Sequence, residues 1–357
     1  MIFFRMLKFL KYYLPLFLII ITAFLRVYFN CMGAVKDACL EKRESIFSDE
    51  NKFPGKQISK FRERSINISR KYLPSPHSEL LIGMVIGADE LEKIPAFKEA
   101  LKTTGTIHVV VVSGFNVSLV SSLIMGVLGS KYKTRNLLIS QFFTFSYSVM
   151  TGFEPPVIRA WIMGSVVSWV KYYGRNINGF TALLFTALVM VIIWPYFLFS
   201  VSFQLSFLAT LGLIVFGNNF VEGLQKLFKT EAFFIEDLGT TISAQVFVLP
   251  LVSYYFGRVS IISFLVNPLV LWTVPIATVI GTFFMFVAGL SSVAAKIMSV
   301  VMYPFLNIFV VAINYFSRFS FSSIDFIVGI VPLVIYYFLV ILSIFLTSKK
   351  RRRSEEK

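Results

Sequence analysis

Histidine and cysteine are almost absent from this chain of 357 residues, which contains two of each. His77 and His108 cannot supply the histidine-rich motif of a binuclear metal hydrolase, so we exclude that class and predict no metal site. The sequence also lacks a Gly-Lys-Ser/Thr phosphate loop, a nucleophile with a histidine partner, and a pair of carboxylates within an apolar segment. We therefore expect a protein that is not an enzyme and needs no cofactor.

Charge is scarce as well, because 15% of the residues are charged whereas 56% are hydrophobic and 17% are aromatic. A soluble domain has about 25% charged residues, so an ordinary globular protein is excluded. A hydrocarbon core of about 30 Å needs roughly 20 apolar residues, and residues 107–128 meet that length. An open sheet cannot satisfy its backbone in lipid. The predicted fold class is all-α, a polytopic integral membrane helical bundle with a small helical exterior segment.

Hydropathy divides the chain into four parts: a basic N-terminal end with a retained first transmembrane helix (1–29), a polar segment (30–106), a transmembrane domain (107–347) and a basic tail (348–357). Nine crossings follow the first helix, about ten in total, near residues 107–128, 136–151, 156–171, 179–195, 197–216, 238–256, 273–290, 297–317 and 325–347. Residues 260–272 are apolar but contain Asn267 and Pro268, so we predict a re-entrant half-helix there.

The net charge of +15 arises mainly from short segments on one side of this map. Seventeen basic residues fall on the side of the N-terminus, against Arg258 and Arg318 in the short loops of the other side. Because cytoplasmic loops collect Lys and Arg, both termini are predicted to be cytoplasmic and residues 30–106 to be exterior. Cys31 and Cys39 would then form a disulfide only if the exterior is oxidising.

Within the exterior segment, residues 51–72 are strongly basic, with Glu63 as the single acid. Phe61, Ile68 and Tyr72 recur at helical spacing, which is typical of an amphipathic helix. Such a helix would touch either lipid headgroups or nucleic acid, and the pattern leaves both open. The candidate DNA contacts are Lys52, Lys56, Lys60, Arg62, Arg64, Arg70 and Lys71.

Polar residues inside the apolar segments are costly in lipid, so their positions identify candidate functional groups. Four groups stand out: His108, Ser113, Gly114 and Asn116; the turn containing Thr151, Gly152 and Pro155, followed by Arg159; Gln204 with Ser206; and Gln245 with Asn267. These residues would either line a hydrated path or join packed helices. Arg159 would either pair with Glu154 or face a water-filled vestibule and meet an anion.

Four motifs in this order resemble the membrane domain of ComEC-type competence proteins. They are Gly105–Leu119, Thr151–Ala160, Ser202–Leu208 and Asn267–Leu269, preceded by Leu81–Gly87. The resemblance covers residues 78–290 and implies a bacterial cytoplasmic-membrane channel that passes single-stranded DNA inward during natural transformation. Its motif residues map onto the candidates from His108 to Ser206 named above. Asn116 stands where family members commonly have histidine.

The resemblance also implies partners: single-stranded DNA, membrane lipid, an exterior DNA receptor, a cytoplasmic ATPase motor and a possible second copy of the chain. We expect this chain to correspond to the membrane domain alone, without the exterior β-domain or the metallo-β-lactamase-like domain of longer members. Two alternatives remain open: a transporter of a small polar solute, and a non-transporting membrane assembly protein. The first would depend on residues such as Gln204 and Asn116, and the second on stripes of small residues that pack helices.

Overall fold

The computed structural model describes residues 55–88, 90–110, 113–129, 134–230, 233–319 and 321–355. The described chain is helical except for one two-stranded antiparallel sheet, β1 (Arg258–Ser260) and β2 (Ser323–Asp325), in which Arg258 pairs with Asp325. The all-α prediction is confirmed. The predicted first helix within residues 1–29 lies outside the described residues, as do Lys52 and the two cysteines, Cys31 and Cys39, whose bonding the sequence leaves open.

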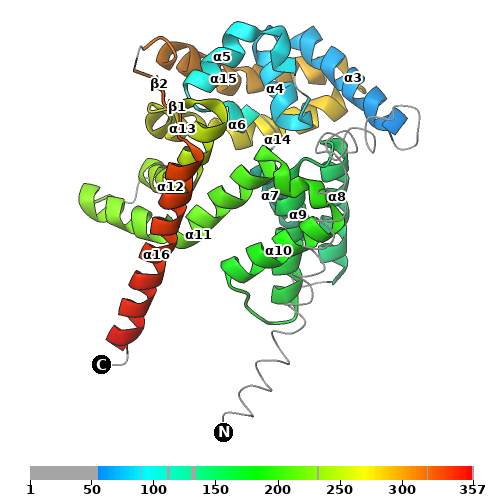
Figure 1. Ribbon diagram of the computed structural model, residues 1–357. Coiled ribbons are helices and arrows are strands. Elements are labelled where there is room, and N and C mark those ends of the chain that lie inside the picture. Colours follow the sequence, from blue (N-terminus) through cyan, green and yellow to red (C-terminus); the bar gives the residue numbers. More distant parts are fainter. Residues whose placement is uncertain are drawn as a thin grey trace.

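The helices are numbered in chain order (Figure 1). Before the sheet they are α3 (Gly55–Tyr72), α4 (His77–Ile86), the 3-10 helix η2 (Glu90–Lys93), α5 (Pro95–Thr103), α6 (Ile107–Val110), α7 (Gly114–Leu128), α8 (Thr134–Met150), α9 (Pro155–Tyr172), α10 (Gly179–Ile193), the 3-10 helix η3 (Pro195–Phe199), α11 (Val201–Phe228) and α12 (Phe233–Phe256). After β1 come α13 (Ser263–Val270), α14 (Thr273–Val287) and α15 (Ser292–Phe316), and after β2 comes α16 (Ile330–Glu355).

Fewer helices are long and apolar enough to cross a membrane than the sequence predicts. Within the described residues there are four: Ile107–Leu128, Val201–Phe228, Phe234–Phe256 and Ser292–Phe316. The pair α13 and α14 makes a fifth if it counts as one broken span. All nine crossings predicted after residue 106 coincide with helices, but α10 and α14 have only 15 residues and α8 only 17. The total of about ten crossings is therefore not confirmed.

The predicted break near residue 267 is present in the backbone. Helices α13 and α14 meet at 45°, and α13 carries Pro268 in its interior. A proline in a helix removes one backbone donor and disturbs the preceding turn, which accounts for a short helix followed by a change of direction. This geometry matches either a broken span or a re-entrant segment.

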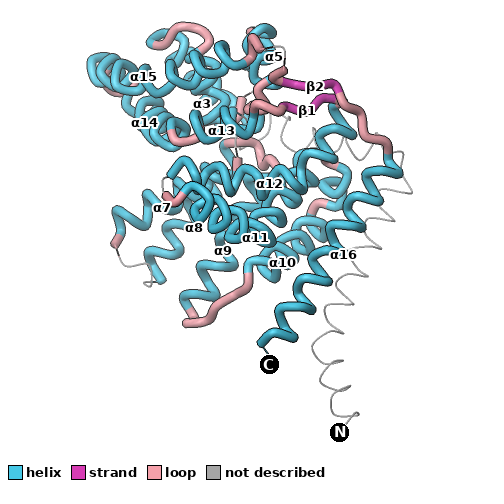
Figure 2. The backbone as a smooth tube through the Cα atoms, turned by 90° about the vertical axis from the view of Figure 1, so that its left-hand side faces the viewer, coloured by secondary structure: helices cyan, strands magenta, loops and turns pink. Residues whose placement is uncertain are grey.

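The helices form two groups that lie one above the other in both views (Figures 1 and 2). The upper group contains α3, α4, α5, α13, α14 and α15, and the lower group contains α7 to α12 and α16. The largest apolar core lies in the upper group, and all ten residues of α4 are buried in or beside it. Residues 77–86 are therefore a core helix, which the prediction of one polar segment over 30–106 did not anticipate.

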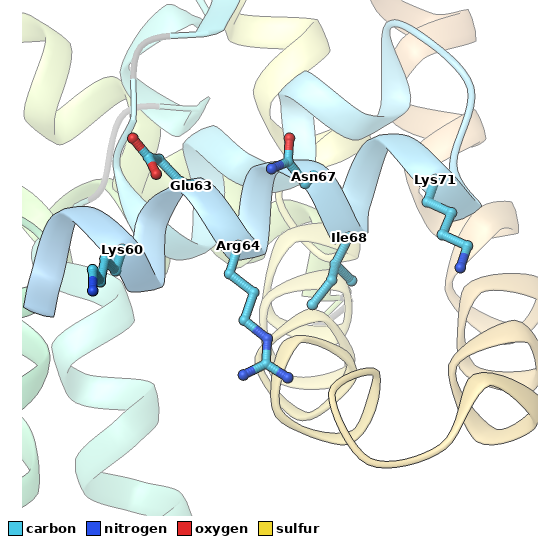
Figure 3. Close-up of a pocket in the computed structure, with 6 residues that line it drawn as sticks. All are labelled: Lys60, Glu63, Arg64, Asn67, Ile68 and Lys71. Atoms are coloured by element: carbon cyan, nitrogen blue, oxygen red, sulfur yellow. The ribbon is translucent and has the colours of Figure 1, made fainter.

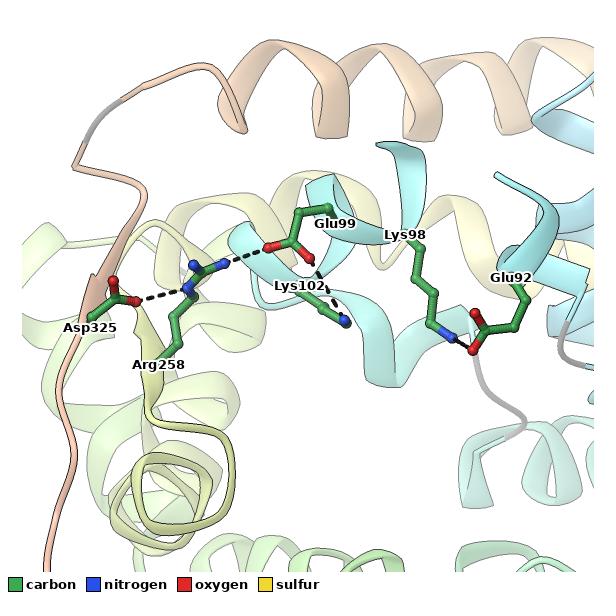
Figure 4. A network of polar contacts seen from close by, with 6 residues as sticks. All are labelled: Glu92, Lys98, Glu99, Lys102, Arg258 and Asp325. Atoms are coloured by element: carbon green, nitrogen blue, oxygen red, sulfur yellow. Dashed lines mark hydrogen bonds and ion pairs between the residues drawn. The ribbon is translucent and has the colours of Figure 1, made fainter. Parts of the chain in front are cut away.

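An ionic network ties the sheet to the upper group (Figure 4). Arg258 on β1 donates to Asp325 on β2 at 2.9 Å and also to Glu99 on α5. Hydrogen bonds to these two carboxylates raise the pKa of Arg258 above its ordinary value. The network holds the end of α12 and the start of α16 against α5.

Candidate functional site

The first motif places a buried amide at the start of α7. Asn116 is 1% exposed, and its Nδ2 donates to the carbonyl oxygen of Met84, near the end of α4, at 2.8 Å. A carbonyl oxygen only accepts hydrogen bonds, so the Nδ2 end of the Asn116 amide faces Met84 and the Oδ1 end faces away from it. The hydroxyl of Tyr147 on α8 is buried beside this amide and is in side-chain hydrogen-bonding contact with it.

The glycine of the same motif is a point of close packing. A Cβ atom built at Gly114 would lie 2.7 Å from Nη2 of Arg159 and 3.1 Å from the carbonyl oxygen of Pro156, both on α9. Ser113 is the N-cap residue of α7, and its side chain makes no capping hydrogen bond. His108 is exposed, and its Nδ1 donates to the carbonyl oxygen of Gly105 at 2.9 Å. Gly114 therefore permits the close α7–α9 contact, whereas the His108 ring bonds its own local backbone.

Arg159 joins α9 to α11. Its guanidinium donates to the carbonyl oxygen of Ser206 and to the hydroxyl of Thr210, and Thr210 in turn donates to the same carbonyl at 2.9 Å. The sequence left pairing with Glu154 or an anion in a vestibule as the alternatives. The guanidinium instead reaches the backbone of the neighbouring helix, so Arg159 and Ser206 act together as a brace.

The turn between α8 and α9 is held by a residue that sequence reasoning placed elsewhere. Arg62 on α3 donates to the carbonyl oxygen of Met150 through Nη2 at 2.9 Å and Nε at 3.2 Å. Burial lowers the pKa of Arg62, and the nearby charge of Glu154 opposes that shift. Gly152 has a φ of 84°, and a Cβ atom there would lie 3.1 Å from Nη2 of Arg62. Helix α3 is thus docked on this turn.

Two more residues of the turn have local roles. The Thr151 hydroxyl is buried and donates to the carbonyl oxygens of Tyr147 and Ser148, both at 3.1 Å. Pro155 is buried at the first position of α9, where the missing backbone donor is tolerated. The second motif therefore builds a compact helix-to-helix connection, and the sequence gives no direct signal that α3 is its partner.

Gln204 is satisfied within the bundle. Its Nε2 donates to the carbonyl oxygen of Leu198 at 3.0 Å, and its Oε1 accepts from the Tyr255 hydroxyl at 2.9 Å. The amide therefore connects η3, α11 and α12. This arrangement matches the helix-joining alternative for the third motif.

Gln245 and Asn267 form the polar face of the α12–α13 contact. Nε2 of Gln245 donates to the Ser263 hydroxyl at 2.9 Å, and Ser263 donates to the carbonyl oxygen of Ser260, also at 2.9 Å. This direction of donation leaves Oε1 of Gln245 as an acceptor with no partner among the described residues. Asn267 lies one turn after Ser263, is 4% exposed, and has an unpaired Oδ1 as well. Sequence reasoning missed Ser263, although its four-residue spacing to Asn267 is a usable signal.

The basic residues of α3 point in different directions. Arg62 faces the α8–α9 turn, and Arg70 forms an ion pair with Glu90 and lies 3.7 Å from Glu79. Lys60, Arg64 and Lys71 are exposed and line an open hollow of about 400 Å³ together with Glu63, Asn67 and Ile68 (Figure 3). The side chain of Lys56 lies outside the described part. The apolar residues Phe61 and Tyr72 contact Phe286 and Phe284 of α14, so this stripe packs on protein.

The candidate residues therefore fall mainly into two sets. The first set joins elements of the bundle through hydrogen bonds or close contacts, and its members are Arg159, Ser206, Gln204, Asn116, Gly114 and Gly152. Gln245 and Asn267 form the second set, because their buried amide oxygens have no partner among the described residues. Thr151 belongs to neither set, since its hydroxyl bonds only carbonyls of α8 among the described residues. Among all the residues that the structure describes, no group of three or more His, Cys, Asp or Glu side chains is arranged to hold a metal ion.

Comparison with known proteins gives one family. The family model described as "Competence protein" matches residues 84–351. The chain is 27% identical over 231 residues to "ComE operon protein 3" of Bacillus subtilis (strain 168), which covers 62% of this chain and 28% of the relative. It is 35% identical over 122 residues to an "Uncharacterized protein" of Aquifex aeolicus (strain VF5), covering 34% of this chain and 29% of the relative. The chain thus spans less than a third of either relative, and no solved structure matches it.

Proposed function

The chain belongs to the competence protein family, and on this premise we propose that it passes single-stranded DNA inward across the bacterial cytoplasmic membrane during natural transformation. The observation that carries the proposal is the pair of buried amide oxygens on Gln245 and Asn267, which have no partner among the described residues. Both residues belong to polar groups that interrupt apolar segments. The proposal includes no catalytic step and no cofactor.

An unpaired buried acceptor is unfavourable by about 1 to 3 kcal/mol unless water or a ligand satisfies it. Native proteins pair the great majority of such groups, so these two oxygens call for an occupant. Amide oxygens accept hydrogen bonds from water and from the amino groups of bases, whereas an apolar solute would leave them unsatisfied. A hydrated path for a polar strand would supply partners for both oxygens.

The test is uptake of labelled single-stranded DNA into proteoliposomes, scored by protection from external nuclease. We expect protected DNA with the unmodified chain, and a loss of tenfold or more in Gln245→Leu and Asn267→Leu. Thr186→Val is the matched control, because the Thr186 hydroxyl is buried and, among the described residues, bonds only the carbonyl oxygen of Ala182 in its own helix. Equal protection of DNA in all variants would reject passage along these residues. Binding of DNA to the unmodified chain without any protected DNA would reject passage that needs no partner protein.

One observation favours the non-transporting assembly protein as a second candidate. The hydrogen-bond partners described above for Arg159 and Gln204 all lie inside the helical bundle, as expected for residues that hold helices together. If this candidate holds, the leucine variants will lower stability without any transport to lose. A transporter of a small polar solute would give uptake of the solute, and not of DNA, that depends on the same amides.

The remaining parts of the proposal concern the surroundings of the chain. We propose that an exterior receptor delivers the DNA, that a cytoplasmic ATPase supplies the energy, and that copies of the chain associate. Both termini lie in the cytoplasm in this proposal, because the basic segments predict that orientation. Labelling of single cysteines placed at each terminus, in intact and in opened cells, tests the orientation directly.

A further inference from the structure

Three basic residues of α3 form one row on its outer face. With about 100° per residue, Lys60, Arg64 and Lys71 fall within an arc of about 40°. All three are exposed, and none has a carboxylate partner among the described residues. The row lines the hollow of about 400 Å³, where Arg64, Ile68 and Lys71 point to one side of the helix (Figure 3).

The opposite face of α3 is fixed to the protein. Ser65 and Ser69 are buried, and the rings of Phe61 and Tyr72 each lie 5.9 Å from a phenylalanine ring of α14. Helix α3 therefore cannot turn its apolar stripe to lipid, as an isolated amphipathic helix would. The face of α3 that remains free to bind a ligand is the one that carries Lys60, Arg64 and Lys71.

An exposed apolar rim lies next to this row, where α14 passes into α15. Nη2 of Arg64 donates to the carbonyl oxygen of Gly289 in the connecting loop at 3.5 Å, so this loop lies beside α3. The crossings predicted from hydropathy put this loop on the cytoplasmic side and residues 30–106 outside, so that part of the predicted map is wrong. Leu290, the residue after Gly289, is 89% exposed, and Val293 at the start of α15 is 67% exposed. Ile297 and Val300 continue the exposed apolar surface along α15, one of the helices long enough to cross a membrane.

We propose that the row Lys60, Arg64 and Lys71 binds the phosphate groups of anionic phospholipids, with Leu290 and Val293 inserted beside their acyl chains. Cations next to exposed apolar groups match the boundary between headgroups and acyl chains, where basic residues favour anionic lipid. Single-stranded DNA is the rival ligand. It would be bound by bases stacking on aromatic rings, and the aromatic residues of α3 face α14 instead.

The test is native mass spectrometry of the full chain in neutral detergent, titrated with phosphatidylglycerol or phosphatidylcholine. We expect phosphatidylglycerol to bind about tenfold more tightly than phosphatidylcholine, and this preference to disappear in the triple variant Lys60→Gln, Arg64→Gln, Lys71→Gln. The control is Lys93→Gln, Lys98→Gln, Lys102→Gln, which removes the same charge from lysines that already pair with Glu90, Glu92 and Glu99. A second variant, Leu290→Ser, should weaken both lipids and keep the preference.

Equal affinity for the two lipids, or an unchanged preference in the triple variant, would overturn the proposal. A labelled thymidine oligonucleotide is titrated into the same samples, and binding that the triple variant loses while lipid preference remains would assign the row to DNA. The proposal requires only that the chain lies in a bilayer. Its failure is separable from failure of DNA passage, because the passage test changes Gln245 and Asn267 and leaves α3 intact.

Discussion

The Tyr336 hydroxyl on α16 donates a hydrogen bond to the carbonyl oxygen of Val246 on α12 at 2.8 Å. Val246 lies four residues before Pro250, which is inside α12 and has no backbone N–H to donate to that carbonyl. The neighbouring Tyr337 hydroxyl donates to the carbonyl oxygen of Phe247 at 2.7 Å. Two adjacent tyrosines of the last helix therefore satisfy backbone acceptors at a proline within α12.

Removing the Tyr336 hydroxyl should destabilise the protein through this carbonyl. We expect Tyr336→Phe to lower the free energy of unfolding by about 1 to 2 kcal/mol, because Val246 loses its donor. In a Pro250→Ala background the helix supplies the donor, so the same change should have little effect. Thermal unfolding in detergent is measured for the unmodified chain, for each single variant and for the double variant, and the four results give the coupling free energy between the two positions. Tyr173→Phe is the control, because Tyr173 is exposed. Additive effects of the two substitutions would contradict the interpretation.

The contact between α11 and α12 depends on a glycine. A Cβ atom at Gly212 would lie 2.3 Å from the carbonyl oxygen of Ser243, a backbone atom that no side-chain rotation can move. We expect Gly212→Ala to destabilise the protein by about 1 to 3 kcal/mol. Gly217→Ala in the same helix is the control, because a Cβ atom there meets nothing within 4 Å, and it should be neutral or slightly stabilising. Equal unfolding midpoints for the two variants would exclude the close approach.

Hydropathy predicts helix positions well in this chain, but it does not fix the number of membrane crossings. The stretch 107–128, predicted as one crossing, is long and apolar enough to be one. The short helix α10 shows the limit, since its 15 residues are apolar throughout but fall short of the roughly 20 that a bilayer needs. Helix α4 was missed because its apolar run, residues 80–86, is short and has polar residues on both sides, and its burial depends on packing against α14 and α15.

Motif residues could be located from the sequence, whereas their roles could not. Asn267 and Gln204 are both amides in apolar surroundings, yet Gln204 has partners at both ends of its amide, whereas Oδ1 of Asn267 has none among the described residues. That difference depends on Tyr255, which is 51 residues away and has no sequence signature. The same holds for Arg62, whose carbonyl partner is 88 residues distant.

Acid should remove a small surface contribution to stability at η2 and α5. The Lys98 ammonium, by a hydrogen bond and by its charge, holds the pKa of Glu92 below its ordinary value. A lowered folded-state pKa stabilises the protein above the unfolded-state value, and this contribution is lost as the pH falls through the folded-state value. We expect the difference in unfolding temperature between the unmodified chain and Lys98→Met to shrink below about pH 4. A difference that stays constant from pH 7 to pH 3 would show that Lys98 acts by packing.

The docking of α3 on the α8–α9 turn should depend on Arg62 and not on its neighbour Arg64. Arg62 is half-buried and donates twice to the carbonyl oxygen of Met150, whereas Arg64 is exposed. Arg62→Met keeps the length of the side chain and removes both donors, so we expect hydrogen exchange at residues 151–154 to accelerate about tenfold. Arg64→Met is the matched control and should leave that exchange unchanged. If both variants exchange like the unmodified chain, the turn is held by its own hydrogen bonds, such as those of Thr151, and α3 merely rests on it.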